Sequence, residues 1–185
     1  MKQSIAILGT ALLLAGCQSV QPVALSSQSS ILEAGFSVQP LSTQTSAGTP
    51  ANMRVSEFVC LPARCGAVVG LGLVAMDVAS PNPNMTAEMA LKSDLLDRRK
   101  TTAALRASIQ QRFNSRTDGA RESVTSLTFY PKSASLRFTA IKTNGRETLH
   151  MSAFGRFTGN TVTMIVAASP NAAIAARYAR PNWIK

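Results

Sequence analysis

Residues 123–169 alternate apolar and polar side chains in four consecutive segments, which strongly restricts the folds open to this chain. Strict alternation is typical of strands that bury one face and expose the other. Short turns separate the segments: 131–134, Asn144-Gly145, which suits a two-residue hairpin turn, and Gly159-Asn160. The pattern therefore predicts an antiparallel meander. The expected inward-facing residues, segment by segment, are Thr125, Leu127 and Phe129; Leu136, Phe138 and Ala140; Leu149, Met151 and Ala153; and Val162, Met164 and Val166.

The opposite face of this meander is expected to be wet and basic. The candidate anion-binding residues are Arg137, Lys142, Arg146 and Arg156. His150 is expected beside them as an exposed strand residue. The whole chain carries 19 Lys and Arg against 9 Asp and Glu, a formal net charge of +10. Such a charge draws a domain toward anionic surfaces, although scattered cations also serve solubility alone.

Two further strands are predicted at 54–59 and 67–78, on either side of Cys60 and Cys65. The second is apolar on both faces and should lie inside the sheet. Its segment 70–75, Gly-Leu-Gly-Leu-Val-Ala, matches part of a dinucleotide-binding fingerprint. That fingerprint requires a helix to follow, and the sequence instead continues as a strand toward Pro81 and Pro83. We therefore interpret the glycines as sites of a bulge or of close packing.

Two helices are predicted. The first begins at a cap, Asn84 or Thr86, and runs to about Phe113. Its apolar residues fall on two neighbouring arcs, so either it bends near 98–100 or its basic side chains lay their stems on apolar surface. The second is an alanine-rich helix within 170–180, followed by Trp183, which we expect to seal that helix to the sheet.

The N-terminus has the form of a secretory leader: Lys2, an apolar stretch too short to span a bilayer, and Leu14-Ala15-Gly16-Cys17. These four residues resemble the lipobox of bacterial lipoproteins. The resemblance implies removal of residues 1–16 and acylation of Cys17, with two or three acyl chains holding the protein durably on a membrane. Gln18, in place of the aspartate that favours inner-membrane retention, indicates the outer membrane, on its periplasmic side, and the sequence leaves the inner membrane and the cell surface open as alternatives.

Residues 17–52 are interpreted as the lipidated cysteine and a flexible tether, and residues 53–185 as a single domain. The tether is rich in Ser, Gln, Thr and Pro. It also contains apolar residues that are unusual in a free linker: Ile31, Leu32, Phe36, Val38 and Leu41. The sequence leaves open whether these residues dock on the domain or stay disordered.

Cys60 and Cys65 remain as an even pair once Cys17 carries lipid. In an oxidising compartment they should form a disulfide. A structural zinc site would need four ligands, and the chain has one histidine, His150, far along the sequence. The spacing also differs from the Cys-x-x-Cys of redox sites.

The fold class predicted from these elements is α+β, an antiparallel sheet flanked by a long helix and a C-terminal helix. The order of elements is similar to that of PsbP-like domains, including the DcrB-like lipoproteins, in which helices cover a central sheet. That resemblance rests on element order over residues 53–185 and implies a non-enzymatic accessory or binding role.

No catalytic residues, cofactor or metal are predicted. Glu147 is three residues from His150 on a strand, which places the two side chains on opposite faces. The sequence therefore indicates a membrane-anchored module that binds another envelope protein. The alternative is a direct binder of anionic lipid, lipopolysaccharide or cell-wall glycan. Nucleic acid is not an expected partner.

Overall fold

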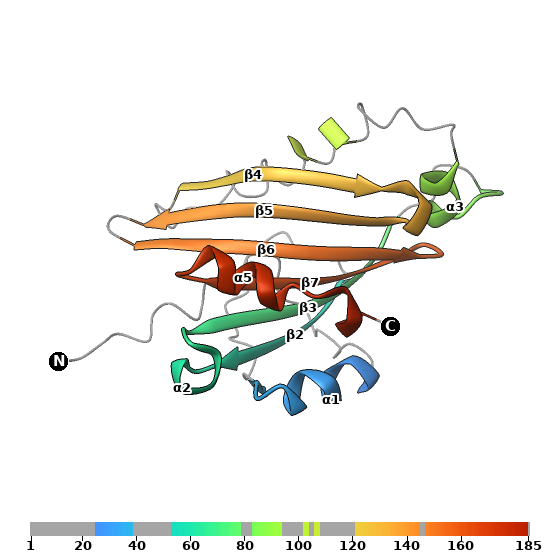
Figure 1. Ribbon diagram of the computed structural model, residues 1–185. Coiled ribbons are helices and arrows are strands. Elements are labelled where there is room, and N and C mark those ends of the chain that lie inside the picture. Colours follow the sequence, from blue (N-terminus) through green and yellow to red (C-terminus); the bar gives the residue numbers. More distant parts are fainter. Residues whose placement is uncertain are drawn as a thin grey trace.

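A single antiparallel sheet organises the fold of the computed structural model (Figure 1). The structure describes residues 25–38, 53–78, 83–93, 102–103, 106–107, 121–144 and 147–184. Within these ranges the sheet has seven strands in the order β1-β2-β3-β7-β6-β5-β4. The strands are β1 Ser37–Val38, β2 Met53–Cys60, β3 Val69–Asp77, β4 Arg121–Tyr130, β5 Ser135–Asn144, β6 Glu147–Thr158 and β7 Thr161–Ser169. The fold is therefore mostly sheet, with a few short helices.

The predicted meander is present as β4 to β7, each strand paired with the next. Asn144 pairs with Glu147, so the two connecting residues are 145 and 146, one position later than the expected turn at Asn144-Gly145. The prediction that Thr125 faces inward is wrong, because Thr125 is exposed. A register shift between Val124 and Ser126 bulges the strand at Thr125, because two residues of β4 there face one residue of β5. Val124 takes the buried position instead, alongside Leu127.

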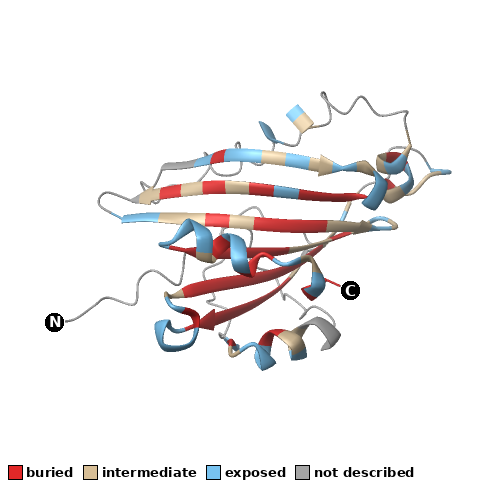
Figure 2. Cartoon of the chain, in the orientation of Figure 1, coloured by how far each residue is buried: buried red, intermediate tan, exposed pale blue. Residues whose placement is uncertain are grey.

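β3 lies inside the sheet, between β2 and β7, and is buried from Val69 to Ala75 (Figure 2). This confirms the position predicted from its two apolar faces. The strand runs on to Asp77 without turning into a helix, so the glycine-rich segment lacks the context of a dinucleotide site.

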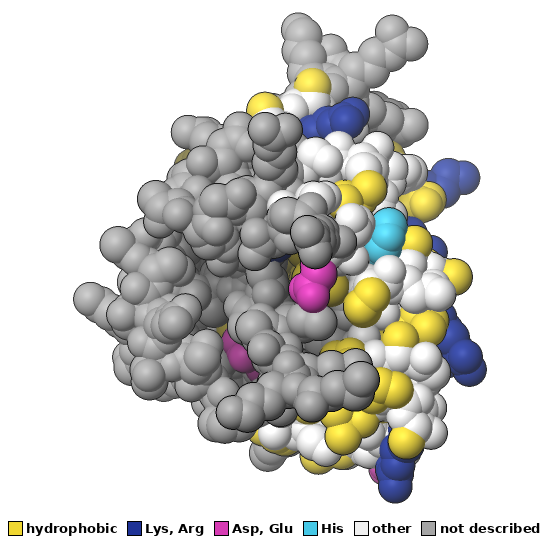
Figure 3. Space-filling view, turned by 90° about the vertical axis from the view of Figure 1, so that its left-hand side faces the viewer, with side chains coloured by type: hydrophobic (Ala, Val, Ile, Leu, Met, Phe, Trp, Pro, Cys, Tyr) yellow, Lys and Arg dark blue, Asp and Glu magenta, His cyan; other side chains and the backbone are white. Residues whose placement is uncertain are grey.

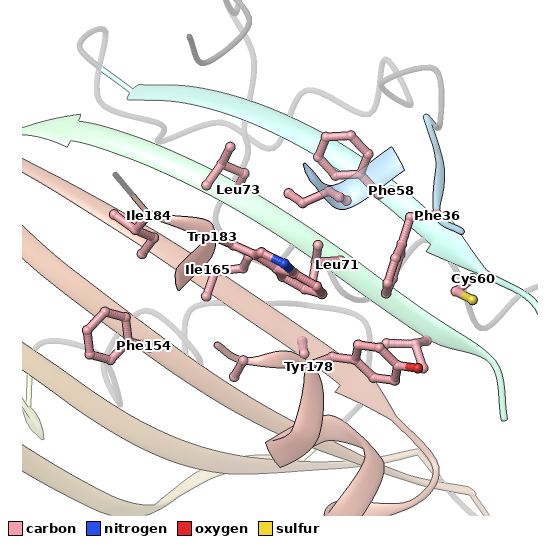
Figure 4. Packing of buried hydrophobic residues seen from close by; sticks show 14 of the residues in the cluster. Phe36, Phe58, Cys60, Leu71, Leu73, Phe154, Ile165, Tyr178, Trp183 and Ile184 are labelled. Carbon is pink, nitrogen blue, oxygen red and sulfur yellow. The ribbon is translucent and has the colours of Figure 1, made fainter. Parts of the chain in front are cut away.

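The front face of the sheet, which faces the viewer in Figure 1, carries the largest core cluster (Figure 4). Two helices and the C-terminal segment cover it: α1 Leu25–Glu33, α5 Ala172–Tyr178 and the short 3₁₀ turn Pro181–Trp183. Ile31 has no exposed surface and Phe36 is buried beside it. Of the five apolar residues whose docking the sequence left open, Ile31 and Phe36 therefore dock on the sheet, Leu32 and Val38 are exposed, and Leu41 lies outside the described residues.

The C-terminal segment is held by a cap and by aromatic contacts. Asn171 Oδ1 accepts hydrogen bonds from the amides of Ala173 and Ile174, which fixes the start of α5. The Trp183 ring is buried. Its centroid lies 5.8 Å from that of Phe36 and 6.1 Å from that of Tyr178. The expectation that Trp183 seals this side of the sheet is confirmed.

The predicted long helix is interrupted. Thr86 caps α3, Ala87–Lys92, with its Oγ1 accepting the amide of Met89. Ser93 then leaves the helix in an extended conformation, and its hydroxyl donates to the carbonyl of Ala90. Serine competes with the backbone for such hydrogen bonds, which is why it tends to end helices. The remainder of the predicted helix lies outside the described residues, except for 102–103 and 106–107.

At the outer edge of the sheet, the β4 backbone next to the bulge accepts a hydrogen bond from a side chain outside the sheet. Arg106 donates a hydrogen bond from its guanidinium Nη2 to the carbonyl oxygen of Val124, at 3.0 Å.

The back face of the sheet buries two smaller clusters, which include Phe138, Met151 and Val166. Within the described ranges, no helix has the length and apolar character needed to span a bilayer.

Candidate functional site

The front face of β4, β5 and β6 extends beyond α5 and remains open in the described structure (Figure 2). We call this surface the arginine face. The strand register places its members on one side of the sheet. They are Ser126, Thr128, Tyr130, Arg137, Thr139, Ile141, His150 and Arg156.

Two of the four predicted basic residues meet on this face. Arg137 pairs with Phe154, and Arg156 pairs with Ser135, so the two arginines are diagonal neighbours on adjacent strands. Diagonal positions on a sheet lie roughly 7–8 Å apart, within reach of long side chains. Figure 3 shows Lys and Arg side chains projecting along its right-hand border, the side on which the front face of Figure 1 lies.

An aromatic ring positions Arg137. Its guanidinium carbon lies 5.6 Å from the centroid of the Phe154 ring, within the range of a cation–π contact. Phe154 belongs to the front core and is buried. Arg137 is thus a cation held at the boundary between the core and the open surface.

A cluster of hydroxyl groups lies next to Arg137 along the same face, since Thr139 is two residues further on β5. Thr139 Oγ1 lies 2.6 Å from the hydroxyl of Thr125 and 2.7 Å from that of Ser126. The bulge in β4 makes both contacts possible, because it brings two successive residues of that strand opposite Thr139. On the described part of the arginine face no carboxylate balances the two arginines.

Lys142 does not belong to this face, which corrects the sequence prediction. It lies two residues beyond Ala140 on β5 and opposite Leu149, on the back of the sheet, with 4% of its surface exposed. Side chains alternate along a strand, so Lys142 must share the face of Leu136, Phe138 and Ala140. Arg146, the fourth predicted residue, lies outside the described residues.

The structure joins Cys60 and Cys65 by a disulfide, as predicted. Cys60 ends β2, and Cys65 ends the four-residue helix α2, Pro62–Cys65. Gly66 follows in the left-handed conformation and its amide donates to the carbonyl of Pro62. The bridge therefore fixes the whole loop against the end of β2. Cys17, the predicted lipidation site, lies outside the described residues.

Sequence reasoning missed one buried ionisable group, Glu57. It lies in β2 opposite Gly72, with 6% of its surface exposed. Burial disfavours the charged carboxylate and raises the pKa of Glu57 to about 7. A signal was present, because Glu57 shares its face of the strand with Val55 and Val59, both of which are buried.

Neither metal chemistry nor a known relative assigns a function to this chain. Within the described ranges, His, Cys, Asp and Glu side chains form no group of three or more that could hold a metal ion. No model of a known protein family matches the chain, and no curated protein matches it.

Proposed function

We propose that this protein is a lipid-anchored module of the bacterial cell envelope that binds a partner protein through its arginine face. The lipobox-like residues 14–17 support the anchor, and the Cys60–Cys65 disulfide is typical of an oxidising compartment. We place the anchor on the periplasmic side of the outer membrane because Gln18 follows Cys17. A likeness to the PsbP-like α/β/α sandwich is part of this proposal and rests on the order of elements expected from the sequence of residues 53–185.

The observation that carries the binding role is the pair Arg137 and Arg156 on an open sheet face. Arginine and tyrosine are enriched at protein interfaces, and the face contains both, with Tyr130 exposed at its edge. The Phe154 ring already restrains Arg137, so little side-chain freedom is lost on binding. Complementary charge then selects a partner with an acidic surface.

Anchoring is tested with Cys17→Ser. The unchanged protein should incorporate labelled palmitate and sediment with membranes, because its acyl chains partition into lipid. The variant should lose the label and be recovered in the soluble periplasmic fraction. Labelling of the Cys17→Ser protein would overturn the anchor, and gradient separation of inner and outer membranes tests its location.

Binding through the arginine face is tested by reversing two charges, Arg137→Glu with Arg156→Glu. Partners are first captured by crosslinking in intact envelopes, and the affinity of the purified pair is then measured. Arginines at the centre of an interface contribute about 2 kcal/mol or more each, which is roughly 30-fold in affinity, so the double variant should bind about 1,000-fold more weakly. A matched control, Lys132→Glu with Arg177→Glu, makes the same change in net charge at exposed positions off the face. Equal losses in both variants would show that net charge alone matters.

Direct binding to anionic lipid, lipopolysaccharide or wall glycan is the competing outcome. Attraction between exposed charges weakens as the Debye length falls from about 10 Å at 0.1 M salt to 3 Å at 1 M. A protein interface with an apolar centre should keep most of its affinity over that range. Tight, salt-sensitive binding to anionic vesicles or lipopolysaccharide, with no protein captured, would replace the proposed partner.

A further inference from the structure

Exposed apolar side chains gather at one end of the molecule. Five large apolar residues are exposed in the described structure, and three of them come from α1, β1 and the disulfide loop: Leu32, Val38 and Leu61. Their exposed fractions are 44%, 59% and 61%. The other two, Met89 and Tyr130, lie on α3 and β4. We call the surface formed by Leu32, Val38, Leu61 and the neighbouring Arg64 the α1–α2 end.

Backbone pairing and one side-chain contact bring these segments together. β1 pairs with the end of β2, with Ser37 opposite Val59, which places the preceding turn beside the disulfide loop. The Arg64 side chain lies over Gly35, where a Cβ atom would come within 3.0 Å of Arg64 Cδ. Gly35 has φ +91°, a conformation that glycine adopts without strain. The α1–β1 turn and α2 thus lie next to each other, and both α1 and α2 are at the lower edge of Figure 1.

The predicted anchor is attached close to this surface. Seven residues separate Cys17 from Leu25, the first residue of α1. Even fully extended, seven residues span at most about 25 Å. Leu32 lies seven residues further along the helix, roughly 10 Å from Leu25. An acylated Cys17 therefore holds the α1–α2 end within reach of the lipid headgroups.

We propose that the α1–α2 end rests on the membrane to which Cys17 is anchored, with Leu32, Val38 and Leu61 inserted at the lipid–water interface. This inference rests on the proposed lipid anchor. Each such side chain moved from water into lipid multiplies the ratio of docked to undocked protein by roughly tenfold or more. The disulfide already fixes the loop that carries Leu61, which limits the entropy lost on docking. Arg64 adds a cation beside the apolar side chains, while Glu33, exposed at the end of α1, opposes anionic lipid.

Docking in this orientation stands the sheet on its β1–β2 edge, so the arginine face points sideways and lies on the strands furthest from the membrane. Five strand-to-strand steps separate β2 from β4 in the sheet. At about 4.8 Å per step the outer strand lies roughly 24 Å from β2. The arginine face would then be presented to a partner in the periplasm while the opposite edge of the sheet rests on lipid.

Energy transfer from the single tryptophan tests this orientation without an added label on the protein. The lipidated full-length chain is reconstituted in vesicles of phosphatidylethanolamine and phosphatidylglycerol that contain dansyl-labelled phosphatidylethanolamine. Trp183 packs against Phe36, next to the α1–α2 end, so docking should give strong transfer. Leu32→Asp with Leu61→Asp should lower the docked-to-undocked ratio by roughly 100-fold and reduce transfer accordingly. Met89→Asp with Thr158→Asp, two exposed positions outside both the α1–α2 end and the arginine face, is the matched control and should leave transfer unchanged.

Each alternative outcome has a distinct signature. A chain that neither carries palmitate nor sediments with vesicles would refute the lipid anchor, and this inference with it. Sedimentation with equal transfer in all variants would refute the docked orientation alone. Amide exchange of the unmodified protein guards against misfolded variants: residues 32–38 and 61–66 should exchange more slowly in vesicles than in detergent, and equal rates would overturn the proposal. A change of oligomeric mass in detergent on substituting Leu32 and Leu61 would identify a contact between two copies instead.

Discussion

Glu57→Gln is expected to remove most of the loss of stability that the protein suffers between pH 5 and pH 8. Burial raises the pKa of Glu57 from 4.5 to about 7 in the folded state. The folded protein therefore binds this proton more tightly than the unfolded chain does. Its contribution to stability is fully present below pH 4.5 and is lost as the pH rises toward and through 7. A shift of this size corresponds to about 3 kcal/mol at alkaline pH.

Urea unfolding of the Cys17→Ser chain, with and without Glu57→Gln, measures this effect at a series of pH values. The quantity of interest is the difference in unfolding free energy between the two chains, because other groups titrate in both. Glu147→Gln is the matched control, since Glu147 is an exposed glutamate on a strand of the same sheet. A difference that stays constant from pH 5 to pH 8 would show that Glu57 does not change its charge in this range.

Trp183→Ala is expected to produce the other large effect, a loss of about 3–5 kcal/mol in unfolding free energy, typical of deleting a buried aromatic ring. The ring makes an edge contact with Phe36 and stacks on Tyr178, so its removal should also loosen α1 and β1. Thermal unfolding followed by circular dichroism gives the stability, and amide exchange of residues 25–38 reports the loosening.

Trp183→Phe tests whether any aromatic ring at this position is enough. Phenylalanine keeps a ring in the cluster, so this variant should recover part of the stability that Trp183→Ala loses. Tyr130→Ala removes an aromatic side chain of which 43% of the surface is exposed and should change stability much less. Equal effects at the two positions would contradict the sealing role of Trp183. Unchanged exchange of residues 25–38 would show that α1 and β1 dock independently of the C-terminal segment.

The sheet was predictable where a single rule governs the chain. Apolar alternation gave the four strands of the meander, and the two apolar faces of residues 69–75 placed β3 inside the sheet. The same rule, applied without error, would also have put Lys142 on the back face with Ala140. Local pattern could not reveal the bulge at Thr125, because an inserted residue changes the alternation only through its pairing with the neighbouring strand.

The features that the sequence pattern did not predict depend on packing between distant segments or on single hydrogen bonds. Ile31 and Phe36 are apolar residues in a polar stretch, and both are buried in a cluster built from distant segments, with the Phe36 ring packed against Tyr178 and Trp183 nearly 150 residues later. Ser93 ends α3 through a local hydrogen bond that competes with an otherwise helical pattern. The arginine face was half predicted, since its two arginines came from alternation, while the stacking of Arg137 on Phe154 came from the strand register.

The hydrogen bond from Arg106 to Val124 bears on how copies of this protein behave when crowded. β4 forms an outer edge of the sheet, and an open edge can pair with a strand from another molecule and start aggregation. The Arg106 guanidinium donates a hydrogen bond to the Val124 carbonyl, which is then not free to accept one from another strand. The adjacent bulge also interrupts the regular spacing of backbone hydrogen-bonding groups that an incoming strand would need. The proposed lipid anchor would concentrate molecules in two dimensions, where edge-to-edge pairing becomes more frequent. We expect the Arg106 contact and the bulge to oppose such pairing at high surface density.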